Sequence, residues 1–396
     1  MVLLQWGLLL LAGLVLVPIV VLWIETMAAV VLPGTAVPRQ TACSSYRRAV
    51  LMPAHNEALV IERTLRQLLP QLRNDDRLVV VADNCTDPTA DIAARLGATV
   101  IIRQDSIRRG KGYALDFGRQ YLAQTADGPP EVMVVVDADC WVESGSLDVL
   151  CDRTHQTQRP TQAIYLFNAG DERPGARQIV SLLAIRVKNW VRPLGLHRLG
   201  QPCLLTGTGM AFPWTALQSV SLASGNLVED MQLGLDLTQA GYPPLLCADA
   251  RVLGTQPHSA AAETSQRTRW EHGHLRTLAS VPKLLWSGLR QRRLSLIALA
   301  LDLAIPPLSL LCMIWVGATA LTTAAALLGG IWLPAIVSYG AGALFAVAVL
   351  TAWRCFATDI ALLQLLAVPL YLLWKLPLYL KFIIRPQLQW IRTDRE

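Results

Sequence analysis

Two long stretches without a charged residue restrict what this chain can fold into. Residues 1–24 contain no Asp, Glu, Lys, Arg or His, and the run from residue 303 to residue 353 contains none either. A helix that crosses a bilayer needs roughly 20 apolar residues. The first run therefore predicts an N-terminal transmembrane helix over residues 1–26. The second run is long enough for two spans within residues 294–353.

The composition agrees with a membrane protein. The 396 residues are 53% hydrophobic and 16% charged, and their mean hydropathy is +0.38. A soluble domain is typically about 25% charged. The first apolar run lacks the basic start of a signal peptide, and no clean A-x-A site follows it. We therefore expect a retained anchor rather than a cleaved leader.

Between and after these runs the sequence divides further. Pro306 and Pro307 predict a break in the helix that leads into the second run, and Gly329 and Gly330 mark a turn inside it. Residues 360–383 either cross the bilayer as a third span or lie along its surface. The predicted order is a transmembrane helix at 1–26, a linker at 27–47, a folded domain at 48–290, a membrane region at 291–385 and a tail at 386–396.

The net charge of +6 does not point to nucleic acid. Basic residues gather beside the apolar runs: Arg39, Arg47 and Arg48 after the first, and Arg290, Arg292 and Arg293 before the second. This positive-inside pattern predicts an integral membrane protein whose middle domain is cytoplasmic, with membrane lipid as the partner of the charge. The eight cysteines include no C-x-x-C pair, which favours reduced, structural thiols.

The middle domain alternates short apolar strands with helices. Strands are predicted at 48–52, 78–82, 99–102 and 132–136. Helices are predicted at 57–72, between the second and third strands up to about residue 96, and at 111–122. This alternation predicts a doubly wound α/β sheet. Ligands of such sheets bind beyond the carboxyl ends of the strands, which are occupied here by Pro53-Ala54-His55, Asp83 and Asp137-Ala138-Asp139.

Asp137 and Asp139 follow a wholly apolar strand. In an extended segment side chains alternate, so both carboxylates would point to one side and Ala138 to the other. Two carboxylates suit Mg²⁺ or Mn²⁺ shared with a diphosphate. The plainer interpretation is one aspartate capping the next helix and one in the turn.

Three further positions near the strand ends could touch a nucleotide. The carboxylate of Asp83 could accept hydrogen bonds from a base or ribose, or form an Asx-turn. Lys111 lies between glycines in a basic loop that enters a helix, which suits a phosphate as well as a solvated surface. Glu57 could be a ligand contact, or only an acidic residue favoured in a first helical turn.

The second half of the domain adds an acidic pair and an aromatic motif. Glu229 and Asp230 precede a helical segment, where Asp230 could deprotonate an acceptor hydroxyl or simply cap the helix. Gln266, Arg269 and Trp270 lie within one helical turn of each other. They could hold a diphosphate and stack on a sugar, or they could form an interfacial anchor.

Taken together, these motifs resemble those of the family 2 glycosyltransferases with a GT-A fold, in the membrane-integrated branch. That branch includes cellulose, chitin, hyaluronan and poly-N-acetylglucosamine synthases and ceramide glucosyltransferases. Its signature of D, D-x-D, an acidic pair ending in D, and Q-x-x-R-W is matched by Asp83, Asp137-Ala138-Asp139, Glu229-Asp230 and Gln266-Arg267-Thr268-Arg269-Trp270.

The resemblance implies a metal-dependent, inverting hexosyltransferase with a mixed sheet that uses a nucleotide sugar, usually a UDP-sugar. By the same resemblance, the nucleotide would be contacted by Pro53, Ala54, His55, Glu57, Asp83 and Lys111. The sugar-phosphate and Mg²⁺ or Mn²⁺ would be bound by Asp137 and Asp139. The base would be Asp230, paired with Glu229, and the diphosphate and the acceptor would be contacted by Gln266, Arg269 and Trp270.

Two features qualify the resemblance. Val228 stands where many polymer synthases have threonine, and the membrane region is small for a full translocation channel. A mixed apolar and basic stretch near residues 176–199 predicts an interfacial helix that brings the acceptor site to the lipid.

We expect a bacterial plasma-membrane enzyme that extends a cell-envelope glycan, with a lipid glycosyltransferase as the alternative. A catalytically dead scaffold would have no use for the intact motifs. A nucleotidyltransferase would share the metal carboxylates but would not need Gln266, Arg269 and Trp270.

Overall fold

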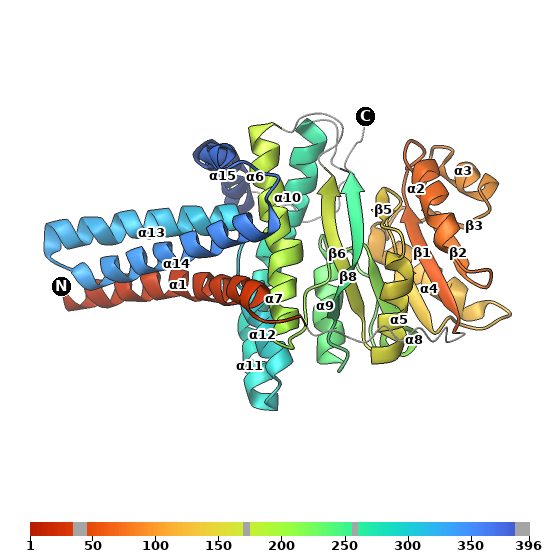
Figure 1. Cartoon of the computed structure of the whole chain (residues 1–396), viewed down its shortest axis with the longest axis horizontal. Helices are drawn as coiled ribbons and strands as arrows, with labels where there is room; N and C mark the ends of the chain where they lie inside the picture. Colours follow the sequence, from red (N-terminus) through yellow and green to blue (C-terminus); the bar gives the residue numbers. More distant parts are fainter. Residues whose placement is uncertain (35–45, 169–174, 256–259, 385–396) are drawn as a thin grey trace. The chain divides into compact units, whose positions relative to one another are not determined.

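The computed structural model describes residues 1–34, 46–168, 175–255 and 260–384 (Figure 1). The chain forms two compact units, and each is assembled from separate stretches of sequence. We call them the sheet unit, with residues 36–170, 202–273 and 387–396, and the helical unit, with residues 1–35, 171–201 and 274–386. Of the predicted domain at 48–290, residues 171–201 and 274–290 thus belong to the helical unit.

The sheet unit contains one eight-stranded sheet in the order β3-β2-β1-β4-β7-β6-β8-β5. The strands are β1 Arg48–Ala54, β2 Arg77–Asp83, β3 Thr99–Arg103, β4 Val132–Val135, β5 Cys140–Val142, β6 Thr161–Asn168, β7 Met210–Pro213 and β8 Leu245–Thr255. The first four strands pair in parallel, whereas β7 is antiparallel to β4 and β6, and β5 is antiparallel to β8. The predicted α/β fold with a mixed sheet is therefore confirmed.

Helices accompany these strands along the sequence. They are α2 Ile61–Leu68, η1 Leu69–Gln71, α3 Thr89–Arg95, α4 Lys111–Gln124, α5 Ser146–Thr157, α8 Trp214–Gln218 and α9 Glu229–Gln239, and α10 Ala260–Thr277 follows β8. The core forms because the central strands are apolar on both faces, as parallel strands covered by helices require. A Cβ on Gly118 of α4 would lie 2.3 Å from Leu51 Cδ1, so the missing side chain lets this helix approach β1 closely.

The helical unit contains the apolar ends of the chain. Its elements are α1 Val2–Val31, α6 Ala176–Arg186, the π-helix η2 Val187–Val191, α7 Arg192–Arg198, η3 Leu278–Ser280, α11 Val281–Gln291, α12 Leu294–Leu303, α13 Leu308–Gly329, α14 Trp332–Phe356, η4 Leu362–Ala367 and α15 Val368–Ile384. Helix α1 continues past residue 26, so the first part of the predicted linker is helical. The residues predicted as a helix near 176–199 are helical throughout α6, η2 and α7.

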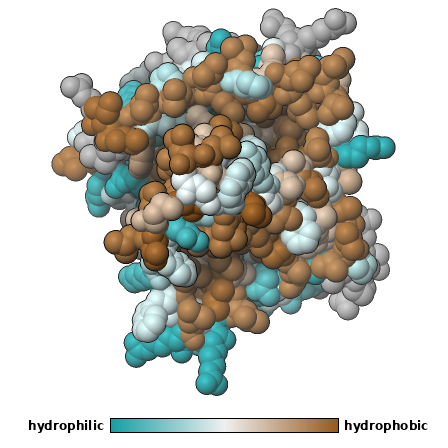
Figure 2. All heavy atoms as spheres, turned by 90° about the vertical axis from the view of Figure 1, so that its left-hand side faces the viewer, coloured by the Kyte–Doolittle hydropathy of each residue, from teal (hydrophilic) through white to brown (hydrophobic). Residues whose placement is uncertain are grey.

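Four helical stretches among the described residues are long and apolar enough to cross a membrane: Val2–Val31, Leu308–Gly329, Trp332–Phe356 and Leu362–Ile384. Figure 2 looks onto the side where α1, α13 and α14 lie and shows a surface made mostly of hydrophobic residues. An apolar surface of this kind is typical of a protein that contacts lipid. The predicted break lies at Pro306 and Pro307, between α12 and α13, and the turn lies at Gly330, which has a φ of 68°.

A buried cluster of charges joins three helices of the helical unit. The Arg192 guanidinium donates from Nε to Asp302 Oδ1 at 2.9 Å and from Nη2 to the Asp302 carbonyl at 2.5 Å. Its Nε also lies 3.4 Å from Glu25 Oε2. Glu25, Arg192 and Asp302 are 1%, 5% and 4% exposed. Since a Cβ on Gly195 would lie 2.0 Å from the Glu25 carbonyl oxygen, α7 also touches the α1 backbone.

Replacing Arg192 by methionine should destabilise the protein strongly, because two buried carboxylates would lose their only positive partner in this cluster. Removing one member of a buried charge cluster typically costs about 3–5 kcal/mol. The measurement is the unfolding temperature in detergent. Arg186→Met is the matched control, because Arg186 pairs with Asp359, whose side chain is 63% exposed. Equal losses in both variants would contradict the cluster's stabilising role.

Candidate active site

The predicted site residues from the first half of the sheet unit lie at one edge of the sheet. Asp83 ends β2, and Asp137 follows β4, with β1 between these two strands. Neighbouring strands lie about 4.8 Å apart, so strands β2 and β4 are separated by about 10 Å. An extended ligand with a base at one end and a diphosphate at the other can bridge such a distance.

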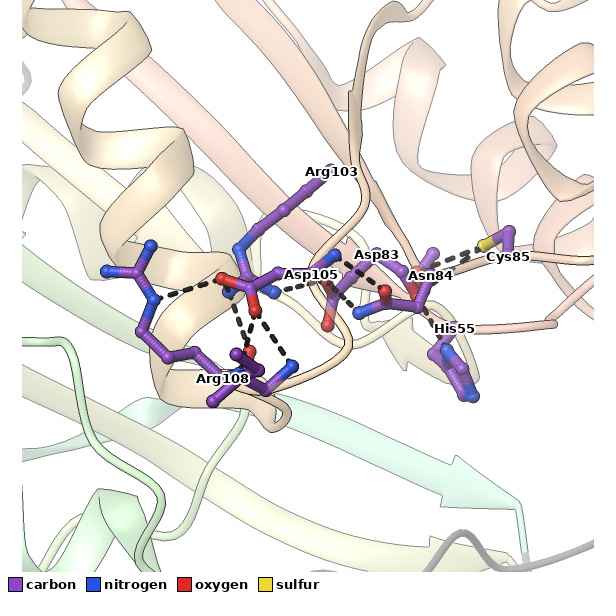
Figure 3. Close-up of polar contacts among 9 residues, drawn as sticks. His55, Asp83, Asn84, Cys85, Arg103, Asp105 and Arg108 are labelled. Atoms are coloured by element: carbon purple, nitrogen blue, oxygen red, sulfur yellow. Dashed lines mark hydrogen bonds and ion pairs between the residues drawn. The ribbon is translucent and has the colours of Figure 1, made fainter.

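Asp83 lies in a network of polar contacts (Figure 3). Its Oδ1 accepts from Arg103 Nη1 at 2.6 Å and from Asn84 Nδ2 at 2.9 Å. Arg103 Nη2 in turn donates to the Arg108 carbonyl at 2.6 Å and to Asp105 at 3.1 Å. Burial raises the pKa of the Asp83 carboxyl, while Arg103 opposes the shift. The predicted Asx-turn is not the role of this side chain, because its oxygen faces Arg103.

The residues that follow β1 lie next to this network. A ring nitrogen of His55, Nδ1, is 2.6 Å from the Asp83 carbonyl oxygen, so the two strand ends are tied together. Pro53 and Ala54 are the last residues of β1, and Ala54 is buried. The Glu57 amide donates to Thr89 Oγ1 at 2.8 Å, which fixes the loop before α2. Glu57 itself precedes α2, because the helix predicted from residue 57 begins at Ile61.

Asp137 and Asp139 converge, but through a turn. The Cys140 amide donates to the Asp137 carbonyl at 3.1 Å, so the segment is not extended and the predicted alternation of side chains is wrong. Asp137, Asp139 and Cys140 nevertheless offer ligand atoms that all lie within 4.8 Å of one another. This spacing and the two hard carboxylates fit a divalent cation such as Mg²⁺ or Mn²⁺.

Lys111 begins α4, and its ammonium lies among acidic groups. Nζ donates to the Gly207 carbonyl at 2.6 Å and pairs with the Asp137 carboxylate. Burial would lower the pKa of this ammonium, but the nearby Asp137 and Glu229 raise it. A Cβ on Gly112 would lie 2.6 Å from the Ser224 carbonyl oxygen, so a bare backbone is needed for α4 to begin here.

The loop opposite Lys111 is held by a buried glutamine. Gln162 Nε2 donates to the Thr208 carbonyl at 2.9 Å, and Gln162 Oε1 accepts from the Thr206 amide at 2.9 Å. The Thr208 hydroxyl accepts from the Asp137 amide at 3.1 Å. Gly207 has a φ of 92°, and a Cβ there would lie 3.3 Å from Asp230 Oδ2 and 3.6 Å from Lys111 Nζ. The bare backbone of Gly207 therefore lies close to both the Lys111 ammonium and the Asp230 carboxylate.

Glu229 and Asp230 begin α9. Asp230 Oδ1 accepts from the Met231 amide at 2.8 Å, and Oδ2 lies on the side of Gly207. Burial, together with the charge of Asp230, raises the pKa of the Glu229 carboxyl to about 7, although Lys111 and Arg269 act in the opposite direction. The positive charges of Lys111 and Arg269 therefore act on this acidic pair. Asp230 is not the capping residue of α9, because the N-cap position is Val228 and no side chain caps the helix there.

Helix α10 lies against the start of α9. A Cβ on Gly273 would lie 2.6 Å from Val228 Cγ1, so the two segments touch directly. Arg269 lies one turn earlier on α10, and its Nε is buried without a hydrogen-bond partner among the described residues. A buried guanidinium nitrogen without a partner fits an anionic ligand, because leaving it unpaired is costly.

Trp270 is connected to the segment of Asp137 and Asp139 through two aromatic residues of β6. Its ring centroid is 5.9 Å from that of Phe167, which is 5.0 Å from that of Tyr165. Burial and the nearby Cys140 and Asp139 raise the pKa of the Tyr165 hydroxyl well above its usual value. Gln266 is partly buried one turn before Trp270 on the same helix.

The sequence analysis missed several residues of this site. Arg103, Asn84, Thr208 and Tyr165 each touch or face a predicted residue, and Gln162 holds Thr208. The only available signal was position, since Arg103 ends the strand beside β2 and Asn84 follows Asp83 directly. Gln162 and Tyr165 lie on β6, which the sequence analysis did not predict.

The family model "Glycosyltransferase like family 2" matches residues 47–273, more than half of the chain. The chain belongs to this family. One curated relative is the probable glycosyltransferase YdaM of Bacillus subtilis (strain 168). The two sequences are 25% identical over 236 residues, which are 57% of this chain and 54% of YdaM. The chain thus spans about half the length of the curated relative it matches.

Two solved glycosyltransferases are also similar. The mannosyltransferase PcManGT from Pyrobaculum calidifontis, in complex with GDP-Man and Mn²⁺, matches 93% of this chain and 99% of its own, with a TM-score of 0.57 and 20% identity. This likeness shows a shared fold. Glucosyl-3-phosphoglycerate synthase from Mycobacterium tuberculosis, with Mn²⁺ and UDP-glucose, covers 52% of this chain and 70% of its own, with a TM-score of 0.37 and 25% identity.

If the chain has the activity of its family, the pH profile of that activity should depend on Glu229. Because the pKa of Glu229 is raised to about 7, lowering the pH through this value adds a proton to the acidic pair, and kcat/KM should fall. Glu229→Gln removes the like charge beside Asp230. The fall in kcat/KM on the acidic side of the profile, its acidic limb, should therefore occur at lower pH. The measurement is kcat/KM between about pH 5.5 and 9.

Asp236→Asn is the matched control, since it changes another carboxylate of α9 whose partner is Gln232. It should leave the limb in place. An unchanged limb in Glu229→Gln would show that the pair does not carry this ionisation.

Proposed function

We propose that this protein is an inverting membrane glycosyltransferase that moves a sugar from a nucleotide diphosphate sugar to a glycan acceptor in cell-envelope polysaccharide synthesis. The observation that carries the proposal is the convergence of Lys111, Asp137, Glu229, Asp230 and Arg269, which influence one another's charge in one unit of the fold. The apolar helices favour a plasma-membrane protein, and the basic residues beside them favour a cytoplasmic sheet unit.

Asp83 supports a nucleobase with a ring N–H on its pairing edge. An ionised carboxylate only accepts hydrogen bonds, so it suits the ring N–H of uracil or guanine and is mismatched to the unprotonated ring nitrogen of cytosine. UDP-sugars are therefore the first donors to test and GDP-sugars the second. The similar mannosyltransferase binds GDP-Man, which keeps guanine in the panel. Pro53, Ala54, His55 and Glu57 would line the same subsite at the end of β1.

Asp137 and Asp139 would hold Mg²⁺ or Mn²⁺, which when bound offsets negative charge on the leaving diphosphate. Arg269 supplies a second positive group, since its buried Nε has no partner among the described residues. Gln266 and Trp270 would position the acceptor and the sugar from the same helical turn.

The chemistry that follows is a single displacement. Asp230 Oδ2 lies beside the bare backbone of Gly207 and would take the proton of the acceptor hydroxyl as its oxygen attacks the anomeric carbon. The bond from that carbon to the diphosphate oxygen breaks as the new bond forms. One base suffices, so the configuration inverts and no covalent sugar–enzyme intermediate forms.

A lipid acceptor is the second candidate. The observation that favours it is that the helices α6, η2 and α7 belong to the same unit as the apolar helices, which would suit a polyprenyl or sphingoid substrate. Purified protein should be incubated with a panel of radiolabelled nucleotide sugars and membrane lipid extract. A ladder of products supports glycan extension, a single lipid-soluble product supports the lipid acceptor, and no turnover of any donor contradicts both.

Asp230→Asn should separate binding from chemistry. The amide cannot accept the proton, so kcat should fall by roughly 10²-fold or more while the Kd for UDP and Mn²⁺ stays nearly unchanged. Turnover and calorimetry on the detergent-solubilised full chain measure the two effects. Asp230→Glu, which keeps a carboxylate, should retain more activity than the amide. Full activity of Asp230→Asn would remove Asp230 from the role of base.

A further inference from the structure

We propose that Lys111 is an internal counter-ion of Asp137, which makes binding of the divalent cation depend on the nucleotide diphosphate. This inference rests on the proposed function and extends it to the coupling between the two ligands. The contacts of Lys111, its charge and the spacing of the carboxylates carry the argument.

The ammonium of Lys111 lies where a cation held by Asp137 would feel it directly. Nζ pairs with the carboxylate of Asp137 and is fixed from the other side by the Gly207 carbonyl at 2.6 Å. The side chains of Lys111 and Asp137 are only 18% and 29% exposed, so water screens their interaction weakly. Asp137 and Asp139 offer ligand atoms within 4.8 Å, and a cation between them would lie close to this ammonium.

Without nucleotide, two positive groups would compete for one carboxylate. A divalent cation gains less from Asp137 while Lys111 neutralises it, and it is repelled by the ammonium at short range. The cation site should therefore be weak in the free protein.

A diphosphate changes this balance. Its oxygens can accept from Lys111, which then no longer neutralises Asp137, and they add negative charge beside the cation. Each ligand thus favours the other. Because coupling between two binding events is reciprocal, Mn²⁺ should strengthen UDP binding by the same factor as UDP strengthens Mn²⁺ binding.

The test is Mn²⁺ binding to the detergent-solubilised full chain, measured by electron paramagnetic resonance with and without saturating UDP. In the wild type, UDP should tighten Mn²⁺ binding by about tenfold or more, within the usual range of such coupling. In Lys111→Met, Mn²⁺ alone should bind about tenfold more tightly than in the wild type, and the added effect of UDP should shrink to about threefold or less.

Two further variants separate the charge of Lys111 from its shape and from general electrostatics. Lys111→Arg keeps the positive charge and should bind Mn²⁺ alone as weakly as the wild type. Arg109→Met removes a charge from the same loop, at an exposed position, and should leave Mn²⁺ binding unchanged.

Unchanged or weaker binding of Mn²⁺ alone in Lys111→Met would overturn the inference. The metal-only measurement uses no nucleotide, so it tests Lys111 even if UDP is the wrong donor. Failure of the wild type to bind UDP would instead count against the proposed donor.

Discussion

The ammonium of Lys111 is the interaction on which the candidate site depends. Asp137, Glu229 and Asp230 come from segments far apart in sequence, and carboxylates placed together away from water repel one another. A positive group among them offsets that repulsion, and Lys111 reaches it because α4 begins against a bare glycine backbone. The loop at Gly207 completes the arrangement by accepting a hydrogen bond from Lys111 and by placing a glycine without a side chain beside Asp230.

Much of the sheet unit could be predicted from the sequence, because local pattern decides its elements. Wholly apolar strands followed by Asp83 or Asp137 identify both the sheet and its functional edge, since chain direction decides where parallel strands end. The remaining features depend on tertiary contacts that leave no trace in periodicity. Arg103 could not be assigned to Asp83, and Gln162 could not be assigned to the Thr208 loop, without knowing which strands are neighbours.

The helical unit shows a similar limit. Uncharged runs identify α1, α13 and α14, because few other environments accept so many apolar residues. The assignment of residues 171–201 to this unit, between β6 and β7 of the sheet, could not be read from composition. The residues next to Arg192 in the sequence suggest a helix on an amphipathic surface. Its partners, however, are Glu25 and Asp302, which lie far before and far after it in the sequence.

The cluster of Glu25, Arg192 and Asp302 has a consequence for biosynthesis. Chains emerge from the ribosome N-terminus first, so α1 is made well before the residues that neutralise and cover its only acidic side chain. Until Arg192 arrives, Glu25 has to remain near water or another temporary partner, because an isolated charge is costly in hydrocarbon. Insertion of the first helix is thereby linked to synthesis of the middle of the chain, and a chain that ends before Arg192 would leave the charge of Glu25 without this partner.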